Sequence, residues 1–130
     1  MLPQQSRMRR AEDFRRSLRS GRRAGGAVLA GYLLPAPEPA DSGGAVRYGD
    51  PAKVGLIVSR AVGSAVVRNR VKRRLRELMR GRLASLPRGC LLVLRAHPAA
   101  ASARQADLAA DLDLVTGRLL RRQVGVLRQE

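Results

Sequence analysis

Residues 66–80 read VVRNRVKRRLRELMR, and this stretch decides the fold. Its apolar residues recur every three or four positions, which is the spacing of one narrow stripe along an α-helix. The helix is expected over roughly residues 65–85, since Pro87 and Gly89 follow as stop signals. It should pack on a core through the residues of that stripe, which are Val67, Val71, Leu75 and Leu78.

The basic residues of this helix oppose its formation. Like charges lie three and four positions apart along it, and they destabilise an isolated helix by roughly 1–3 kcal/mol in total. Glu77 offsets only part of this repulsion through the arginines next to it. Arg68 and Arg70 lie in the first turns, where the helix dipole is already positive. A solvated surface is the ordinary explanation of a charge run, but it does not require this arrangement.

A polyanion does explain the arrangement. The arginines and the free N–H groups of the helix N-terminus point positive potential at one place, which suits a phosphate. The charge geometry therefore favours nucleic-acid binding through this helix. A helix lying on a membrane surface is the weaker alternative, because the apolar stripe is narrow and aliphatic and is needed for the core.

Composition supports the same partner. The chain has 130 residues, with 26 Lys and Arg against 10 Asp and Glu, for a formal charge of +16. All the basic residues except Lys53 and Lys72 are arginine, whose guanidinium matches phosphate bidentately. With no run of about 20 apolar residues and no apolar segment after the basic start, we expect no membrane span, no secretory signal and a cytoplasmic protein. The single cysteine, Cys90, is expected to be buried and inert.

The rest of the chain reads as one domain of alternating elements. We expect a flexible basic arm over residues 1–9, a single RNA-binding domain over 10–122, and a tail over 123–130. Within the domain, the patterns predict a helix over 10–20 and strands over 27–34, 53–59 and 90–95, with one more short strand around 22–25. Residues 35–51 form a Pro/Gly-rich loop, interpreted as a surface insertion.

A last helix opens at Ser102, which has capping-box spacing to Gln105. Its acidic residues lie early, as the helix dipole favours. The pair Asp107 and Asp111 could in principle hold a divalent ion. Complementarity to the helix dipole is the better explanation of these two acidic residues. The helix should pack through its apolar stripe of Leu108, Leu112, Val115 and Leu119.

Aromatic residues are few, namely Phe14, Tyr32 and Tyr48. This scarcity disfavours a sheet that stacks bases through aromatic strand motifs. A helix-turn-helix is disfavoured too, because the basic helix is flanked by strands and not by a partner helix. Phe14 and Tyr32 could still frame a groove on which unpaired bases stack. Core packing is an equally good explanation for Phe14.

A resemblance follows from these residues. Residues 55–77, GLIVSRAVGSAVVRNRVKRRLRE, resemble the signature of the bacterial ribonuclease P protein subunit. Residues 7–14, RMRRAEDF, are similar to that family's first helix, and Tyr32 falls where the family has a strand tyrosine. The resemblance covers residues 7–122. It implies an α-β sandwich of order α-β-β-β-α-β-α, with a small central sheet and a left-handed β-α-β crossover, contrary to the general handedness rule.

The resemblance also implies a function. In this family the RNA subunit carries the chemistry with Mg²⁺, removing the 5′ leader of precursor tRNA endonucleolytically, and the protein has no catalytic side chains, no metal site and no required protein partner. The family's RNA contacts can be carried over by position, and charge geometry adds Arg80. The residues expected to contact the RNA subunit are then Arg60, Arg68, Asn69, Arg70, Lys72, Arg73, Arg76 and Arg80. The leader cleft would be lined by Phe14, Leu18, Tyr32, Arg68 and Asn69.

This sequence departs from the family pattern at three places. Leu18 stands where a second aromatic is common, Arg60 replaces a usual lysine, and the 35–51 loop is longer than typical. Two rival functions remain open, a general RNA chaperone and a nuclease acting alone. The second is disfavoured because the only histidine, His97, has no nucleophile partner in the sequence pattern. The type of RNA subunit, further substrates and the oligomeric state are not determined by the sequence.

Overall fold

A computed structural model describes residues 2–36 and 51–128 of the chain. Helices and strands follow the predicted order α-β-β-β-α-β-α, including the short strand at Arg22–Gly25. Most of the expected 35–51 loop, residues 37–50 with Tyr48, lies outside the described residues, as do residues 129–130 of the tail. The elements are η1 (Gln4–Ser6), α1 (Ala11–Ser20), β1 (Arg22–Gly25), β2 (Leu29–Leu34), β3 (Lys53–Ile57), α2 (Ala65–Arg80), η3 (Leu83–Ser85), β4 (Leu91–Ala96), η4 (Pro98–Ala101) and α3 (Gln105–Arg128).

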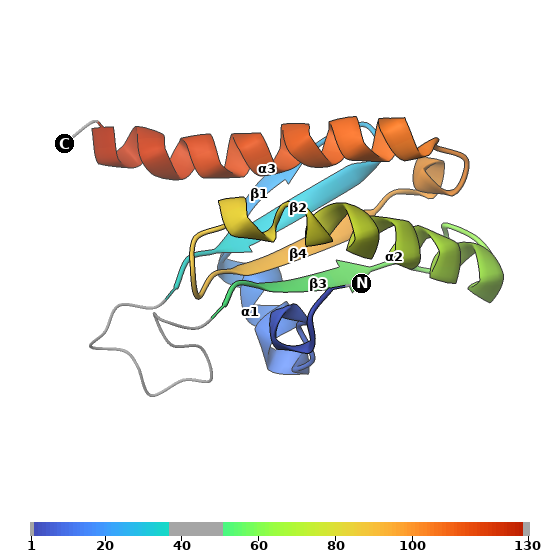
Figure 1. Ribbon diagram of the computed structural model, residues 1–130, viewed down its shortest axis with the longest axis horizontal. Helices are drawn as coiled ribbons and strands as arrows, with labels where there is room; N and C mark the ends of the chain where they lie inside the picture. Colours follow the sequence, from blue (N-terminus) through green and yellow to red (C-terminus); the bar gives the residue numbers. More distant parts are fainter. Residues whose placement is uncertain (1, 37–50, 129–130) are drawn as a thin grey trace.

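The four strands form one sheet in the order β1-β2-β4-β3. β2 is antiparallel to both β1 and β4, whereas β3 runs parallel to β4. A parallel pair needs a crossover connection, and α2 supplies it. With α2 in front of the sheet, the chain passes from β3 to β4 in the left-handed sense, as expected from the resemblance (Figure 1).

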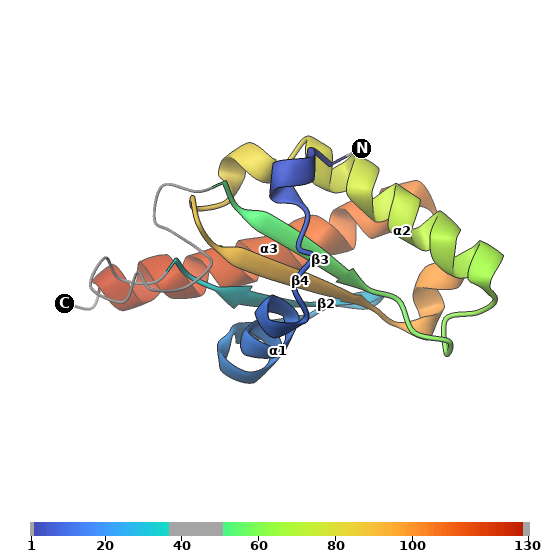
Figure 2. The same ribbon diagram turned by 90° about the horizontal axis from the view of Figure 1, so that it is seen from below.

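Helices cover both faces of the sheet. α2 and α3 lie on one face, and α1 lies on the other (Figure 2). Successive strand residues alternate between the faces, as the pleat requires. The larger core, between the sheet and α2 and α3, includes Leu29, Leu33, Val54, Leu92 and Leu94. The smaller core, on the α1 face, consists of Met8, Ala30, Tyr32, Leu91 and Val93, with Phe14, Leu34 and Ile57 packed against it.

The apolar stripe of α2 is shifted by one position at its C-terminal end. Val71, Leu75 and Met79 are fully buried, whereas Val67 and the predicted Leu78 are only half-buried. The spacing of four between the three buried residues keeps them on the same side of the helix. The helix ends at Arg80, earlier than expected, and residues 83–85 form a separate 3₁₀ turn. In α3 the predicted stripe is confirmed, because all four residues are buried.

Residues 2–9, which the sequence pattern predicts to be a flexible basic arm, lie against the sheet in the structure. Leu2 and Met8 are buried, and the Met8 N–H donates to the Val54 carbonyl at 2.9 Å. Arg7 forms an isolated parallel bridge with Val54. β3 lies at the edge of the sheet, so its outer backbone groups need partners. The N-terminal segment, residues 2–9, supplies some of them.

Asp111 binds the backbone of the turn between β1 and β2, a role that complementarity to the helix dipole does not include. Its carboxylate accepts hydrogen bonds from the backbone N–H groups of Ala27 (2.9 Å), Val28 (3.0 Å) and Leu29 (2.8 Å). The side chain is only 7% exposed and closes the turn between β1 and β2. A β-carbon at Gly26 would overlap this carboxylate, so glycine is needed there for the close approach.

The start of α3 also differs from the expected capping box. The helix begins at Gln105, three residues after Ser102, which instead ends the preceding 3₁₀ turn. The Asp107 side chain reaches back to Arg104, the residue before the helix. Its carboxylate accepts from the Arg104 N–H at 3.3 Å and from Arg104 Nε at 3.2 Å. The hydrogen bond from the Arg104 side chain lowers the pKa of Asp107.

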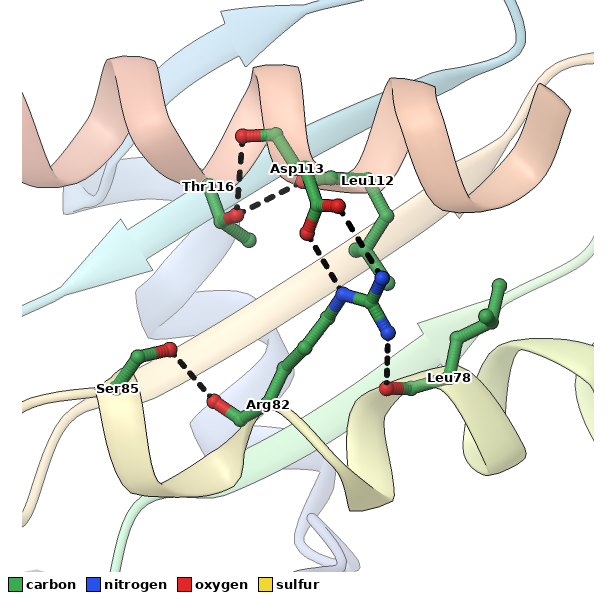
Figure 3. Close-up of polar contacts among 6 residues, drawn as sticks. All are labelled: Leu78, Arg82, Ser85, Leu112, Asp113 and Thr116. Carbon is green, nitrogen blue, oxygen red and sulfur yellow. Dashed lines mark hydrogen bonds and ion pairs between the residues drawn. The ribbon is translucent and has the colours of Figure 1, made fainter. Parts of the chain in front are cut away.

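An ion pair ties the end of α2 to α3 (Figure 3). Arg82 Nε donates to Asp113 Oδ1 at 2.6 Å and Nη2 donates to Oδ2 at 3.1 Å, while Nη1 donates to the Leu78 carbonyl at 2.9 Å. This hydrogen bonding raises the pKa of Arg82 and lowers that of Asp113. Because the pair is solvent-exposed, its contribution to stability is modest. Its role is to orient the segment after α2.

Replacement of Asp111 by alanine should destabilise the fold, because three backbone N–H groups lose their acceptor. We expect the free energy of unfolding to fall by about 3 kcal/mol, measured by urea denaturation. Asp107→Ala is the matched control, since it removes the same charge from an exposed residue of the same helix, and it should destabilise the fold far less than Asp111→Ala. Equal losses in the two variants would contradict the turn-closing role.

Cys90 should be unreactive in the folded protein. Burial raises its pKa to about 12, so the thiolate is scarce at pH 8. A disulfide reagent such as dithionitrobenzoate should therefore react with Cys90 only after unfolding in urea. Rapid reaction of the native protein would show that the thiol is accessible.

Candidate nucleic-acid interface

The N-terminus of α2 combines the positive end of the helix dipole with basic side chains and no acidic residue in its first turn. The Ser64 hydroxyl caps the helix by accepting from the Val67 N–H at 3.3 Å, after Gly63, whose φ of +154° suits glycine. Arg68 and Arg70 follow in the next turn, where the dipole and the guanidinium charges add.

The eight residues predicted to contact an RNA subunit lie on the loop before α2 and along α2 itself. Arg60, Asn69, Arg70, Arg73 and Arg80 are exposed, whereas Arg68, Lys72 and Arg76 are half-buried. Within the described residues, no salt bridge joins any of the eight to an acid. Arg68 Nε is buried with no hydrogen-bond partner in the described structure. The exposed Glu77 makes no direct ion pair with these residues in the described structure either.

The two flanks of α2 have different surroundings. Lys72 and Arg76 line a cavity of about 260 Å³ above β3. On the opposite flank, Arg74 Nη1 donates to the Ala103 carbonyl at 3.3 Å, which turns this arginine toward α3. Lys72 and Arg76 thus lie on the flank of α2 that faces the N-terminal segment and β3, two elements that lie beside α2 in the fold (Figure 2).

Phe14 belongs both to this cavity and to the smaller core. It packs against the cluster that contains Met8 and Tyr32, and its ring also forms part of the cavity wall. The ring lies directly over Gly55, where a β-carbon would overlap it. Glycine in the middle of a strand thus marks the close approach of an aromatic side chain.

The other residues of the expected leader cleft do not line this cavity. Tyr32 is 9% exposed, and its hydroxyl accepts from Arg23 Nε at 3.3 Å, with the guanidinium 5.9 Å from the ring centroid. Its ring therefore offers little face for stacking. Leu18 is 38% exposed, near the C-terminal end of α1. Arg68 and Asn69 lie on α2, outside the cavity lining.

Some residues of the site were missed by the sequence reasoning. Arg7 and Arg9 line the cavity opposite Lys72 and Arg76, because the N-terminal segment docks on β3. Arg95, the exposed residue of β4, is in register with Ala30 and Ile57 on the α1 face. The signal for Arg7 and Arg9 was the buried Met8 between them, in an alternation typical of a strand-like segment.

The described residues contain neither a cluster of metal ligands nor a membrane-spanning helix. No three His, Cys, Asp or Glu side chains lie close enough together to hold a metal ion. No helix in that part of the chain is both long enough and apolar enough to cross a membrane.

Comparison with known proteins identifies a family. The family model described as Ribonuclease P matches residues 2–120. The chain is 51% identical over 121 residues to the ribonuclease P protein component of Streptomyces avermitilis, covering 92% of this chain and 96% of that one. It is 52% identical over 114 residues to the ribonuclease P protein component of Thermobifida fusca, covering 87% of this chain and 75% of that one.

Solved structures share the fold. The RNase P protein of Staphylococcus aureus matches with a TM-score of 0.72 at 21% identity, covering 86% of this chain and 93% of that one. The RNase P protein of Thermotoga maritima matches with a TM-score of 0.67 at 20% identity, covering 88% and 96% of the two chains.

Arg68→Ala combined with Arg70→Ala should weaken RNA binding without unfolding the protein. No side-chain hydrogen bond or ion pair of either residue within the described structure is lost, so the circular dichroism spectrum should not change. If each arginine meets a phosphate, the slope of log affinity against log salt should fall by up to about two units. The control is Arg118→Ala with Arg121→Ala, which removes the same charge from α3, together with one hydrogen bond from Arg118 Nη1 to the Gly25 carbonyl at 3.0 Å. Equal weakening by both pairs would show that only net charge matters.

Proposed function

Because the chain belongs to the ribonuclease P protein family, we propose that it binds the catalytic RNA of ribonuclease P and the 5′ leader of precursor tRNA. In this role it assists the magnesium-dependent endonucleolytic removal of the leader. The protein is a component of an endoribonuclease of tRNA processing that works with an RNA subunit. We further propose that it acts in the cytoplasm.

The observation that carries the proposal is the row of unpaired cations on α2. Arg70, Arg73 and Arg80 are exposed and have no acidic partner among the described residues. Phosphates would remove their mutual repulsion and release the counterions condensed on the RNA. Such a surface suits a folded RNA, whose phosphates form an extended anionic face.

The cavity beside α2 supports a role for single-stranded RNA. Phe14 gives one aromatic surface, and four cationic side chains surround it, namely Arg7, Arg9, Lys72 and Arg76. Stacking on an aromatic ring combined with a basic groove is how proteins hold unpaired nucleotides without strong sequence preference. A 5′ leader is such a strand. Tyr32 and Leu18 contribute less to it than the resemblance implies.

The side chains favour chemistry on the RNA subunit. Cys90 is buried and its pKa is raised to about 12, so it is unsuited to act as a nucleophile. His97 is half-buried and precedes a 3₁₀ turn, with no nucleophile hydrogen-bonded to it in the described structure. The acidic residues near the interface, Glu12, Asp13 and Glu77, do not form a set of three metal ligands. The residues present therefore do not fit a protein-held magnesium site, and we assign that ion to the RNA subunit and the substrate.

Reconstitution tests the proposal. The purified protein is mixed with a transcribed bacterial ribonuclease P RNA and a 5′-labelled precursor tRNA at low magnesium, with protein alone and RNA alone as controls. Cleavage at the mature 5′ end only in the full mixture is the expected result. Binding without a gain in cleavage would favour a general RNA chaperone, and cleavage by the protein alone would favour an independent nuclease.

A further inference from the structure

The outer face of α1 carries a second group of cations, apart from those of α2. Arg15 and Arg19 are exposed on this helix, and Arg16 is half-buried. The residues that α1 buries are Asp13 and Ser17, two positions before Arg15 and Arg19. Because two positions turn an α-helix by about 200°, Arg15 and Arg19 lie on the side that faces away from the sheet.

These cations keep their charge unneutralised within the described chain. None of the three arginines of α1 forms an ion pair there. Glu12 is the exposed acid of the same face, and it leaves an excess of positive charge. Arg9 and Arg10, directly before the helix, are exposed as well and extend this charge.

Stability of the helix does not account for the whole arrangement. Arg19 lies in the last turn, where the negative end of the helix dipole favours a cation. Arg15 lies in the middle of α1, where the dipole has no such effect. Arg15 and Arg19 are four positions apart, so their like charges oppose the helix. An anionic partner would remove this repulsion.

The outer face of α1, formed by Glu12, Arg15, Arg16 and Arg19, is separate from the other basic surfaces. α1 and α2 lie on opposite faces of the sheet (Figure 2). The cavity beside α2 contains none of the four residues in its lining. Each helix is about 10 Å thick, so ligands on the two outer faces lie more than about 20 Å apart. This exceeds the Debye length of about 8 Å at physiological ionic strength, so two polyanions bound there repel each other little.

The chemistry of this face selects duplex RNA. The face is convex and has no aromatic side chain, so it does not offer a surface on which unpaired bases stack. Arg15 and Arg19 follow each other by one turn and form a row along the helix. Guanidinium groups bind phosphate bidentately. Duplex RNA is recognised mostly through its phosphates, its 2′-hydroxyls and its shape, which such a row can contact.

We propose that the outer face of α1 is a second RNA-docking surface, so that the protein bridges two RNA duplexes, one held by α2 and one by α1. The inference rests on the proposed function insofar as α2 holds RNA. It adds an activity, the joining of two duplexes, that requires neither the cavity nor cleavage. The second duplex is either another segment of the catalytic RNA or a separate RNA molecule.

Energy transfer between two labelled RNA hairpins of unrelated sequence tests the bridge. The full chain is titrated into an equimolar mixture of donor-labelled and acceptor-labelled hairpins. The transfer should rise to a maximum and fall again when protein is in excess, because each hairpin then has its own protein. Sedimentation velocity with excess hairpin should show complexes of one protein with two hairpins. A transfer that only rises, or complexes with a single hairpin, would overturn the proposal.

Arg15→Gln combined with Arg19→Gln tests the role of α1. The maximum transfer should fall by about fivefold or more, whereas the affinity for a first hairpin should fall by less than about threefold, because α2 still binds it. The circular dichroism spectrum should not change, since both side chains are exposed and neither forms an ion pair in the described structure. Should the variant fail to fold, the wild-type stoichiometry still decides.

Arg118→Gln combined with Arg121→Gln is the matched control. It removes the same charge from α3, together with the hydrogen bond from Arg118 to the Gly25 carbonyl, and it should retain the transfer. Equal loss of transfer in the α1 and α3 variants would show that only net charge matters, and the proposal would be wrong.

Reconstituted complexes identify the second duplex. If it is a separate RNA, wild-type protein bound to the catalytic RNA should capture a labelled hairpin, and the α1 variant should not. If it is a segment of the catalytic RNA, the complex should capture no hairpin, and the α1 variant should bind the catalytic RNA more weakly than the α3 control does.

The two proposals can fail separately. Wild-type protein that supports cleavage of precursor tRNA but never joins two hairpins would overturn the α1 surface and leave the proposed function intact. Protein that joins hairpins without any gain in cleavage would overturn the proposed function and leave the α1 surface.

Discussion

Burial of one apolar stripe holds a helix that its own charges oppose. Removal of Val71, Leu75 and Met79 from water stabilises α2 by about 5–9 kcal/mol in total. Repulsion among its basic residues costs roughly 1–3 kcal/mol. Packing therefore exceeds repulsion, and the charges remain together on the solvent side. A phosphate-bearing partner then relieves a repulsion that the free protein retains, which adds to the affinity for that partner.

The left-handed crossover gives this helix its location. α2 connects two parallel neighbours, β3 and β4, so it covers the β3 side of the sheet, and the left-handed sense of the crossover decides which face it covers. The N-terminal segment docks on the edge strand β3 through Met8 and Val54. Two basic segments far apart in the sequence thus line one cavity. The larger core under α2 and α3 carries most of the apolar burial, whereas the smaller core on the α1 face positions Phe14.

Local patterns allowed most elements to be predicted from the sequence. The periodicity of α2 and α3, the β-branched strand at Lys53–Ile57 and the short strand at Arg22–Gly25 all depend on neighbouring residues. Contacts between distant residues were not predictable in this way. Asp111 binds the turn at Ala27 from more than 80 positions away, and nothing near Asp111 in the sequence announces this.

In the candidate site, too, some features follow from local sequence patterns and others depend on contacts between distant residues. The exposed cations of α2 follow from the helix spacing, but the cavity beside α2 depends on where the N-terminal segment docks. That segment looked like a loose arm because its charges are conspicuous, whereas Leu2 and Met8 are buried only in the presence of β3. The resemblance implies a cleft lined by Phe14, and the Phe14 ring lines a cavity together with Lys72 and Arg76. It did not indicate that Tyr32 is covered by Arg23 or that Asp13 is enclosed.

The docking of residues 2–9 on β3 also has a consequence for biosynthesis. The ribosome makes this segment before its binding site on β3, which lies more than 40 positions further along the chain. β3 in turn needs β4, its strand neighbour, which follows α2. A nascent or truncated chain therefore carries the positive charge of the N-terminal segment before the cavity beside α2 can form. That cavity is complete only when β4, the last strand, is in place.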